Sequence, residues 1–387
     1  MANPPRGILI SAGEPSGDHY AGELARLLRA RWPECVFFGC AGPKMRAAGV
    51  DAVVRTEDLS VVGLLEVVEH LPRIWGKFQQ LVAAARSRKP DLAILTDAPD
   101  FHFRVAAKLK KQGVPVVWLV APQVWAWRQG RVKTMRKVID RLLCIFPFEK
   151  AFFETHSVPA AYIGHPLAGR IKPGISREEF FRKHKIALDR PLVAVLPGSR
   201  KGEALRHLPA LKDAAVALSK DRKLSFILPA SPACGAAFFL IPLADSPIRA
   251  IDGEAWEAMA FCDVALAASG TVTVEAALLG TPMVTFYKVT DLSWKLGKYL
   301  VKVPFYTMVN LVAGRKVVPE LMQAEMTGER LALETARLLD SEEERGKMKK
   351  DLAEVAGSLS LAGDAMARAA DEVARLLGVP VLEGSKS

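Results

Sequence analysis

Short apolar runs alternate with segments of helical periodicity along almost the whole chain, and this alternation limits the folds open to it. In the helical segments apolar side chains recur three and four apart, as at Leu24, Leu27 and Leu28. The runs that read as β-strands are 7–11, 35–38, 92–96, 115–120, 142–146, 160–163, 192–196, 224–228, 248–251, 263–267 and 283–287. Strands that alternate with helices favour parallel sheets with helices on both faces. The sequence therefore predicts an α/β fold.

The length and the pattern together indicate two domains. A chain of 387 residues exceeds the usual size of a single core. The strand pattern starts afresh near Pro191, after a polar and basic stretch that contains Pro173 and Gly174. We predict two Rossmann-like domains that face each other across a cleft, and a C-terminal helix that packs back on the first domain or on a partner. The expected ranges are 1–168 for the first domain, 169–190 for the connection, 191–355 for the second domain, and 356–387 for the last helix and tail.

The charge of the chain favours anionic ligands. The net charge is +11, and residues 101–141 hold ten Lys or Arg but one acid, Asp140. Such patches attract phosphates or anionic membranes, whereas no nucleic-acid-binding motif is present. The five cysteines have no metal-ligand spacing, which indicates reduced thiols and no dedicated metal site. No apolar run is long enough to span a bilayer and no leader segment is evident, so we expect a cytoplasmic protein.

Polar residues follow the first and third predicted strands. Asp97 and Asp100 come after 92–96, and the turn of small residues after 7–11 can bring backbone N–H groups to a ligand. Because parallel strands end at one edge of a sheet, these turns and the tryptophan-rich loop 121–128 are expected to line a cleft. The structural alternative is that Asp97 caps the next helix, that the tryptophans fill the core, and that the first turn is capped by Ser16 or Asp18.

Two turns of the second domain have the composition of a nucleotide diphosphate site. Gly198 lets a ligand approach the backbone after strand 192–196, and a second turn of small polar residues follows strand 263–267. A carboxylate one helical turn further on can accept both hydroxyls of a ribose. The residues predicted to hold the nucleotide on these grounds are Ser199, Arg200, Ser269, Gly270, Thr271 and Glu275. His165 lies at the predicted domain junction, where a hinge or packing role explains a histidine at least as well as catalysis does.

Several motifs resemble those of the lipid-A-disaccharide synthase family, and they run in family order across most of the chain. The matching segments are 12–18 (AGEPSGD), 63–67 (GLLEV), 97–101 (DAPDF), 124–128 (VWAWR), 147–149 (PFE), 164–166 (GHP), 196–200 (LPGSR), 268–271 (ASGT), 310–315 (NLVAGR) and 318–321 (VPEL). The departures are small. Pro15 stands where a small residue is usual, Ala121 and Gln123 where Ser is common, Val309 in place of Pro, and His102 where Asn is frequent.

The resemblance implies the GT-B fold and an inverting, metal-independent glycosyltransferase with no cofactor. Its substrates would be UDP-2,3-diacylglucosamine and 2,3-diacylglucosamine 1-phosphate, joined into a β-1,6-linked disaccharide phosphate of lipid A biosynthesis. Asp97 is the expected base, with Glu14 or Asp100 as alternatives. Asn310 and Arg315 join the expected UDP site. The residues expected to contact the sugars are Gly13, Ser16, Gly17, Asp100, Trp125, Trp127 and His165.

Two other functions share this architecture: a UDP-sugar epimerase and a non-catalytic nucleotide- or lipid-binding module. Acylated substrates reside in a bilayer, so the resemblance also implies a peripheral protein on the inner face of the inner membrane of a Gram-negative-type bacterium. The segment 294–304 has the pattern of a helix in an anionic headgroup layer, and 61–75 is the other apolar candidate. The alternative is an ordinary amphipathic helix with its lysines in water and its apolar side in the core. A homodimer is allowed by the sequence.

Overall fold

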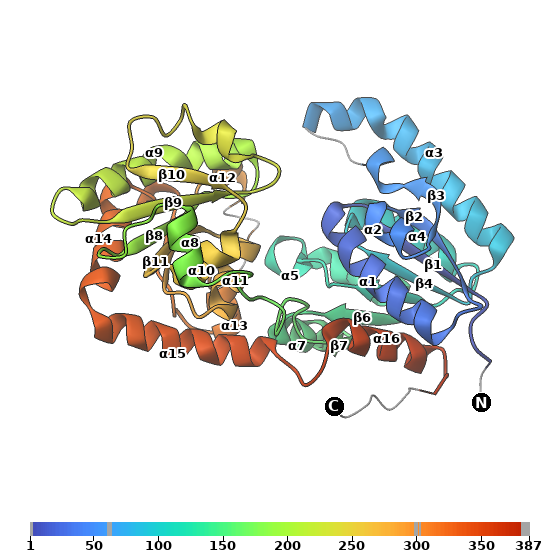
Figure 1. The fold of residues 1–387 in the computed structure, drawn as a ribbon. Helices are drawn as coiled ribbons and strands as arrows, with labels where there is room; N and C mark the ends of the chain where they lie inside the picture. The colour runs from blue at the N-terminus through green and yellow to red at the C-terminus, as the bar shows by residue number, and fades with distance from the viewer. Residues whose placement is uncertain (1–2, 60–63, 298–300, 302, 381–387) are drawn as a thin grey trace. The chain divides into compact units, whose positions relative to one another are not determined.

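The structure is a computed structural model that describes residues 3–59, 64–297, 301 and 303–380. The chain forms two compact units, each with its own parallel sheet (Figure 1). Unit 1 extends to Pro166 and also includes the chain from Leu361 onward, whereas unit 2 is Leu167–Ser360. The chain thus passes between the units twice.

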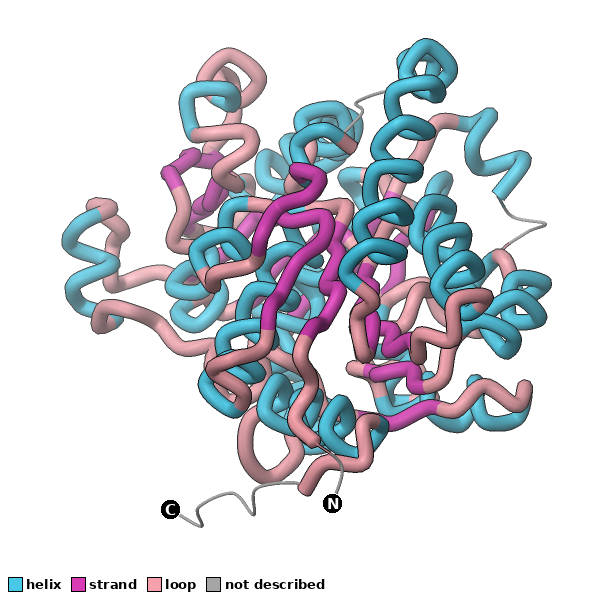
Figure 2. The backbone as a smooth tube through the Cα atoms, turned by 90° about the vertical axis from the view of Figure 1, so that its right-hand side faces the viewer, coloured by secondary structure: helices cyan, strands magenta, loops and turns pink. Residues whose placement is uncertain are grey.

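Unit 1 is built on a seven-stranded sheet with the strand order β3-β2-β1-β4-β5-β6-β7. The strands are β1 (Gly7–Ala12), β2 (Val36–Ala41), β3 (Asp51–Arg55), β4 (Leu92–Thr96), β5 (Val116–Leu119), β6 (Arg141–Cys144) and β7 (Ala160–Tyr162). The helices are α1 (Pro15–Arg31), α2 (Pro43–Ala47), α3 (Leu64–Arg88), α4 (Pro99–Lys110), α5 (Val124–Trp127), α6 (Val132–Val138), α7 (Pro147–Thr155) and α16 (Ala365–Leu376). Figure 2 faces this unit and shows its strands between layers of helices.

Unit 2 has a six-stranded sheet with the strand order β10-β9-β8-β11-β12-β13. The strands are β8 (Leu192–Leu196), β9 (Ser225–Ala230), β10 (Ile248–Asp252), β11 (Val264–Ala268), β12 (Met283–Tyr287) and β13 (Glu320–Met322). The helices are α8 (Arg177–Lys183), α9 (Lys201–Ser219), α10 (Ala255–Phe261), α11 (Thr271–Leu278), α12 (Asp291–Gly297), α13 (Met308–Ala313), α14 (Gly328–Asp340) and α15 (Glu342–Leu359).

The central strands of both sheets are apolar because helices cover both of their faces. Every residue of β1, β4, β8 and β11 is buried, as expected in a doubly covered parallel sheet. In each sheet the strand order reverses beside the first strand, between β1 and β4 and between β8 and β11. Ala12 pairs with Thr96, and Leu196 pairs with Ala267. The turns after each pair of strands therefore meet at the switch point where open α/β sheets bind ligands.

Every strand predicted from the sequence is present, and the fold class is confirmed. Two edge strands, β3 and β13, were not predicted. The stretch 169–190 is not a bare connection, because it contains α8 and belongs to unit 2. The Phe180 ring of α8 lies 5.7 Å from that of Phe261 in α10.

The last helix packs on unit 1 of its own chain, which was one of the two expected alternatives. In Figure 1 α16 lies beside α1, and Asp371 pairs with Arg31 at 2.8 Å. Arg368 Nε donates a hydrogen bond of 2.8 Å to the carbonyl of Ile163. These contacts attach α16 to the end of α1 and to the residue that follows β7.

The helix expected over 294–304 is shorter than predicted among the described residues. The described part of α12 is Asp291–Gly297, and residues 301 and 303–306 are not helical. Lys298, Lys302 and the residues 299–300 lie outside the described part of the chain, as do 61–63 of the other apolar candidate.

Candidate functional site

Asp97 lies at the switch point of unit 1, directly after β4. Its Oδ1 accepts a hydrogen bond of 2.6 Å from the backbone N–H of Gly13, and its Oδ2 accepts one of 3.1 Å from that of Glu14. Both donors precede α1, so the carboxylate faces the positive end of that helix. The alternative that Asp97 caps its own following helix is wrong, because α4 begins at Pro99 after Ala98 with no side-chain cap.

The backbone around Asp97 is held in a conformation that few side chains adopt. Asp97 has φ +50° and Ala98 has φ +35°, both in the left-handed region. Such strain persists where surrounding contacts enforce it, and it concentrates at functional sites. Gly17 of α1 is one of these contacts, since a Cβ there would lie 1.7 Å from Asp97 Oδ2. The glycine thus allows the helix to approach the carboxylate closely.

His102 holds the turn at Asp97 through contacts of both of its ring nitrogens. Its Nδ1 lies 3.0 Å from the carbonyl oxygen of Asp97, and its Nε2 lies 2.7 Å from the Ser11 hydroxyl. Complete burial lowers the pKa of His102 to about 4, so the ring is neutral at pH 7. The neutral tautomer that fits both contacts donates from Nδ1 to the carbonyl and accepts the Ser11 proton at Nε2. His102 therefore has a positioning role that the sequence did not reveal.

The environment of Asp97 suits a base that works near neutral pH. Burial raises the pKa of its carboxyl to about 7, with the Gly13 N–H opposing and the neighbouring Glu14 charge adding to the rise. A carboxylate with this pKa is ionised in half of the molecules near pH 7 and can accept a proton from a hydroxyl. Glu14 itself is exposed, as is Ser16, and both belong to the turn that leads into α1.

Asp18 of the same motif has a different task. It is buried, and its two carboxylate oxygens accept hydrogen bonds of 2.9 and 3.0 Å from the backbone N–H groups of Lys44 and Met45. These donors begin α2, so Asp18 caps that helix. The alternative that Ser16 or Asp18 caps α1 is wrong, since the N-cap residue of α1 is Glu14.

The aromatic loop after β5 is anchored by one tryptophan and exposes another. Trp125 is buried, and its Nε1 donates a hydrogen bond of 3.1 Å to Glu149 at the start of α7. Burial raises the pKa of Glu149 to about 8. Trp127 is 44% exposed, and the Arg128 guanidinium lies 4.1 Å from its ring centroid. The loop thus combines a core tryptophan with one that is free to contact a ligand.

Asp100 and His165 differ sharply in exposure. The Asp100 side chain is 78% exposed and pairs with Arg128 and Arg131. His165 is buried, its ring centroid lies 5.3 Å from that of Phe146, and burial lowers its pKa to about 4. Among the predicted sugar-binding residues, His165 therefore has the surroundings of a neutral packing histidine.

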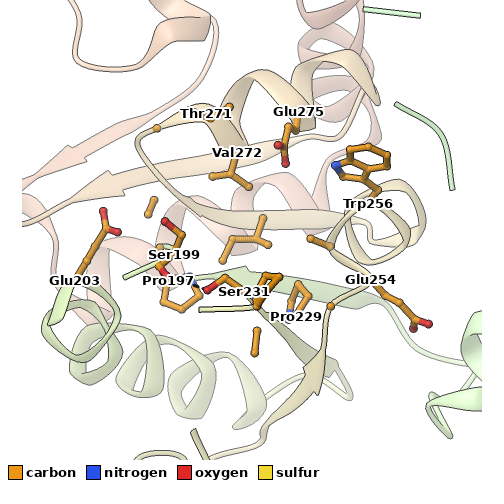
Figure 3. A pocket seen from close by; sticks show the side chains of 18 of the residues that line it. Pro197, Ser199, Glu203, Pro229, Ser231, Glu254, Trp256, Thr271, Val272 and Glu275 are labelled. Carbon is orange, nitrogen blue, oxygen red and sulfur yellow. Dashed lines mark hydrogen bonds between the residues drawn. The ribbon is translucent and has the colours of Figure 1, made fainter. Parts of the chain in front are cut away.

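A cavity of about 640 Å³ lies over the carboxyl ends of β8, β9, β10 and β11 in unit 2. Ser199, Ser269, Gly270, Thr271 and Glu275 all line it, so the two turns that were predicted to hold a nucleotide meet at one cavity. α9 and α11 both begin beside it, and the positive amino-terminal ends of helices favour anions. Figure 3 shows Ser199 and Thr271 on different sides of this cavity.

Glu275 and Trp256 form the far wall of the cavity. In Figure 3 the Glu275 carboxylate extends from α11 toward the indole of Trp256, which comes from α10. Burial raises the pKa of Glu275, and a hydrogen bond from Trp256 partly opposes this rise. Trp256 was not predicted from the sequence, because no motif surrounds it. Its ring adds to the apolar part of the lining, which also includes Pro197, Pro229 and Val272.

The turn after β8 requires its glycine. Gly198 has φ +113°, and a Cβ there would lie 2.5 Å from the carboxyl carbon of Glu203. Arg200 follows as the N-cap residue of α9 and is exposed. It does not line the cavity itself but stands next to Ser199, which does. A flexible guanidinium at this position can reach a bound diphosphate.

Asn310 and Arg315, which were expected to contact UDP, are not among the residues that line this cavity. The buried Asn310 amide donates to the Val318 carbonyl and to Glu320, and its oxygen accepts from the backbone N–H groups of Val317 and Val318. These four bonds use the full capacity of an amide side chain. Asn310 therefore braces the backbone of the motif 310–321, and its expected contact with UDP stays a prediction.

Arg315 forms ion pairs with two acidic residues of α15. Its guanidinium lies 2.8 Å from Asp351 and 2.9 Å from Glu354. The carboxylate of Glu320 from the same motif accepts from Thr307 N–H at 2.9 Å and so holds the start of α13. The Ser269 hydroxyl donates to the carbonyl of Tyr306 at 2.9 Å, which ties that loop to the cavity.

Two further observations concern ligands and membranes. Among the described residues, no group of three or more His, Cys, Asp or Glu side chains has an arrangement that could hold a metal ion. None of the helices in the described part of the chain combines the length and apolar character that a bilayer crossing requires.

The fold matches solved structures of two kinds of enzyme. The kitacinnamycin glycotransferase aligns with a TM-score of 0.66 at 18% identity, over 98% of this chain and 100% of that one. A UDP-GlcNAc 2-epimerase from Neisseria meningitidis, solved with UDP-GlcNAc, aligns with a TM-score of 0.61 at 12% identity, over 91% and 97%. The two doubly wound units define the GT-B fold of glycosyltransferases.

Sequence comparison narrows this class to one family. The model of the lipid-A-disaccharide synthetase family matches residues 8–373. A lipid-A-disaccharide synthase of Solibacter usitatus (strain Ellin6076) is 60% identical over 370 residues, which cover 96% of this chain and 97% of that protein. The chain belongs to the lipid-A-disaccharide synthase family, and it is a glycosyltransferase.

Proposed function

We propose that this chain transfers 2,3-diacylglucosamine from UDP to the 6-hydroxyl of 2,3-diacylglucosamine 1-phosphate. The observation that carries the proposal is membership of the synthase family over nearly the whole chain. The products are the β-1,6-linked disaccharide 1-phosphate and UDP. The nucleotide belongs to unit 2 and the acceptor to unit 1.

The proposed reaction is one inverting displacement. The acceptor oxygen forms a bond to the anomeric carbon of the donor sugar, and the bond from that carbon to the diphosphate oxygen breaks. The acceptor proton passes to the Asp97 carboxylate, whose pKa of about 7 matches this task. The leaving diphosphate gains negative charge, which Arg200 and the amino-terminal ends of α9 and α11 stabilise.

The UDP site that we propose is the cavity of unit 2. The diphosphate lies against Ser199 and the Ser269–Thr271 turn, and the Glu275 carboxylate accepts from the ribose hydroxyls. Charge-assisted hydrogen bonds contribute about 1.5–3 kcal/mol each. Arg200→Ala and Glu275→Ala should therefore weaken UDP binding by about ten- to a hundredfold in calorimetry. Unchanged UDP affinity in both variants would place the nucleotide elsewhere.

The epimerase alternative makes a different demand on substrates. An epimerase acts on the UDP-sugar alone, whereas the proposed transfer needs an acylated acceptor. Release of UDP from UDP-diacylglucosamine should therefore require the acceptor and produce a disaccharide. Conversion of the donor without acceptor would favour an epimerase, and binding of UDP without turnover would favour the non-catalytic module.

We further propose that the protein works at an anionic membrane on the cytoplasmic side, where its acylated substrates reside. Lys295 of α12 is exposed, and the neighbouring Trp294 ring lies 5.9 Å from that of Tyr306. On unit 1, Trp75 of α3 is 50% exposed and stacks on Phe78 at 5.0 Å. Both are interfacial aromatic groups near basic residues. A homodimer is the remaining expectation, and a solution mass of twice 42.1 kDa would establish it.

A further inference from the structure

We propose that Arg128 and Arg131 bind the phosphate of the acceptor, so that this pair selects a sugar 1-phosphate over the same sugar with a free 1-hydroxyl. The inference rests on the proposed transfer reaction and adds the subsite that recognises one end of its acceptor. Both arginines belong to unit 1, in the loop after β5 that is anchored by Trp125.

The two guanidinium groups converge on one carboxylate. Arg128 Nη1 lies 3.5 Å from Asp100 Oδ2, and Arg131 forms a close ion pair with Asp100 Oδ1. The Arg131 side chain is 22% exposed and that of Arg128 is 42% exposed, whereas Asp100 is 78% exposed. Both arginine side chains are thus more covered by the protein than the Asp100 carboxylate, which lies mostly in solvent.

The loop that presents the arginines is rigidly built. Trp125 is fixed through its bond to the buried Glu149, and Gln129 Nε2 donates a hydrogen bond of 2.9 Å to the carbonyl of Trp125. The central carbon of the Arg128 guanidinium lies over the Trp127 ring, 4.1 Å from its centroid. Guanidinium groups that are already oriented lose little freedom when they bind an anion, and their planar forks match phosphate oxygens.

The local charge favours an anion stronger than a carboxylate. Residues 101–141 carry ten basic residues against the single acid Asp140, which accepts a hydrogen bond of 2.6 Å from Lys110. Two arginines and Asp100 leave one positive charge in the cluster. A phosphate monoester brings a charge of about −1.5 to −2 and three acceptor oxygens, so it satisfies both forks better than Asp100 alone.

The Asp100 carboxylate can move away from the two arginines at a small cost in free energy. It lies in the first turn of α4, where the positive end of that helix stabilises an acidic side chain without any partner. Its exposure leaves it room to turn toward solvent. Asp100 also lies three residues after Asp97 on the same edge of the sheet. The carboxylate thus occupies the site as a stand-in for the phosphate oxygens.

The test compares two acceptors, diacylglucosamine 1-phosphate and the same sugar with a free 1-hydroxyl, in neutral detergent micelles with saturating donor. Wild type should prefer the phosphorylated acceptor in kcat/KM. In Arg128→Gln/Arg131→Gln this preference should fall by about ten- to a hundredfold, because charge-assisted bonds to phosphate are lost. The turnover of the free-hydroxyl acceptor and the UDP affinity should stay unchanged. Arg128→Lys/Arg131→Lys keeps the charge but lacks the planar guanidinium, so its preference for the phosphorylated acceptor should lie between those of wild type and the double Gln variant.

The matched control is Lys133→Gln/Arg136→Gln, which removes two exposed charges from the adjacent α6. It should keep the full preference for phosphate. An unchanged preference in the Arg128/Arg131 variant, or an equal loss in the control, would overturn the assignment. So would a loss of sedimentation with phosphatidylglycerol vesicles at unchanged phosphate preference, which would indicate a lipid headgroup instead. Absence of disaccharide from wild type with either acceptor would refute the proposed function itself.

Discussion

Burial of Asp97 has two expected consequences: its carboxylate acts as a base near neutral pH, and its ionisation lowers the stability of the folded protein. The substitution Asp97→Asn removes both and lets each be measured. Turnover should fall by about 10²–10⁴-fold, the usual contribution of a positioned base. The rise of kcat/KM with pH, which in wild type should have a midpoint near the Asp97 pKa of about 7, should disappear in the variant.

The stability effect follows from the same pKa. In the folded protein the value is about 7, and its ordinary value is 3.8. Each pKa unit corresponds to about 1.4 kcal/mol, so ionisation of the buried group costs the folded state up to about 4 kcal/mol. Because the pKa is higher in the folded protein, the protonated Asp97 carboxyl favours the folded state. This contribution to stability is fully present below pH 3.8 and is lost as the pH rises through 7. Between about pH 4.5 and about pH 8, wild type should lose about 3 kcal/mol relative to Asp97→Asn.

The measurement is denaturation of both proteins at the two pH values, followed by tryptophan fluorescence. Five of the seven tryptophans lie in unit 1, so this signal reports mainly on the unit that contains Asp97. A difference between the two proteins that does not vary with pH would refute the assignment of a raised pKa. Asp140→Asn is the matched control, because Asp140 accepts from Val116 N–H at 2.7 Å at the opposite end of β5. That variant should lose stability and keep its turnover.

Two further predictions follow from the site and the proposed docking surface. Gly17→Ala would place a methyl group 1.7 Å from the Asp97 carboxylate, so it should cost about 1–3 kcal/mol of stability and abolish turnover; full activity would mean that Asp97 need not lie against α1. Changing Lys295, Lys298 and Lys302 together to Gln should abolish sedimentation with anionic vesicles at low salt, since each lysine near such a surface contributes about 1 kcal/mol. Equal sedimentation of wild type and variant would instead direct attention to the exposed Trp75 of α3.

The central strands could be predicted because burial on both faces makes them uniformly apolar. β1, β4, β8 and β11 are such strands, and their carboxyl ends determine where the turns meet. The missed strands lie at sheet edges. β3 begins and ends in the exposed residues Asp51 and Arg55, and β13 has three residues, so neither produces an apolar run.

The turns that carry the candidate site could be predicted from the sequence, whereas the contacts made by residues distant in sequence could not. Asp97 and the Ser269–Thr271 turn follow buried strands, which fixes their place in the sheet. The bracing contacts of Asn310 could not be predicted, because a motif residue that braces the backbone looks the same in sequence as one that binds UDP. His102 and Trp256 were missed for the complementary reason. Their roles arise from contacts with Asp97 and Glu275, which the fold brings near them.

The central claim is that this chain joins two acylated glucosamines with inversion. The most direct measurement is isolation of the product from UDP-2,3-diacylglucosamine and 2,3-diacylglucosamine 1-phosphate, followed by mass spectrometry and proton NMR of the new glycosidic bond. We predict one tetraacyl disaccharide monophosphate, released with one UDP, in which a β-anomeric proton reports a bond to carbon 6. An α-linked product, an epimerised UDP-sugar or two unchanged substrates would contradict the account.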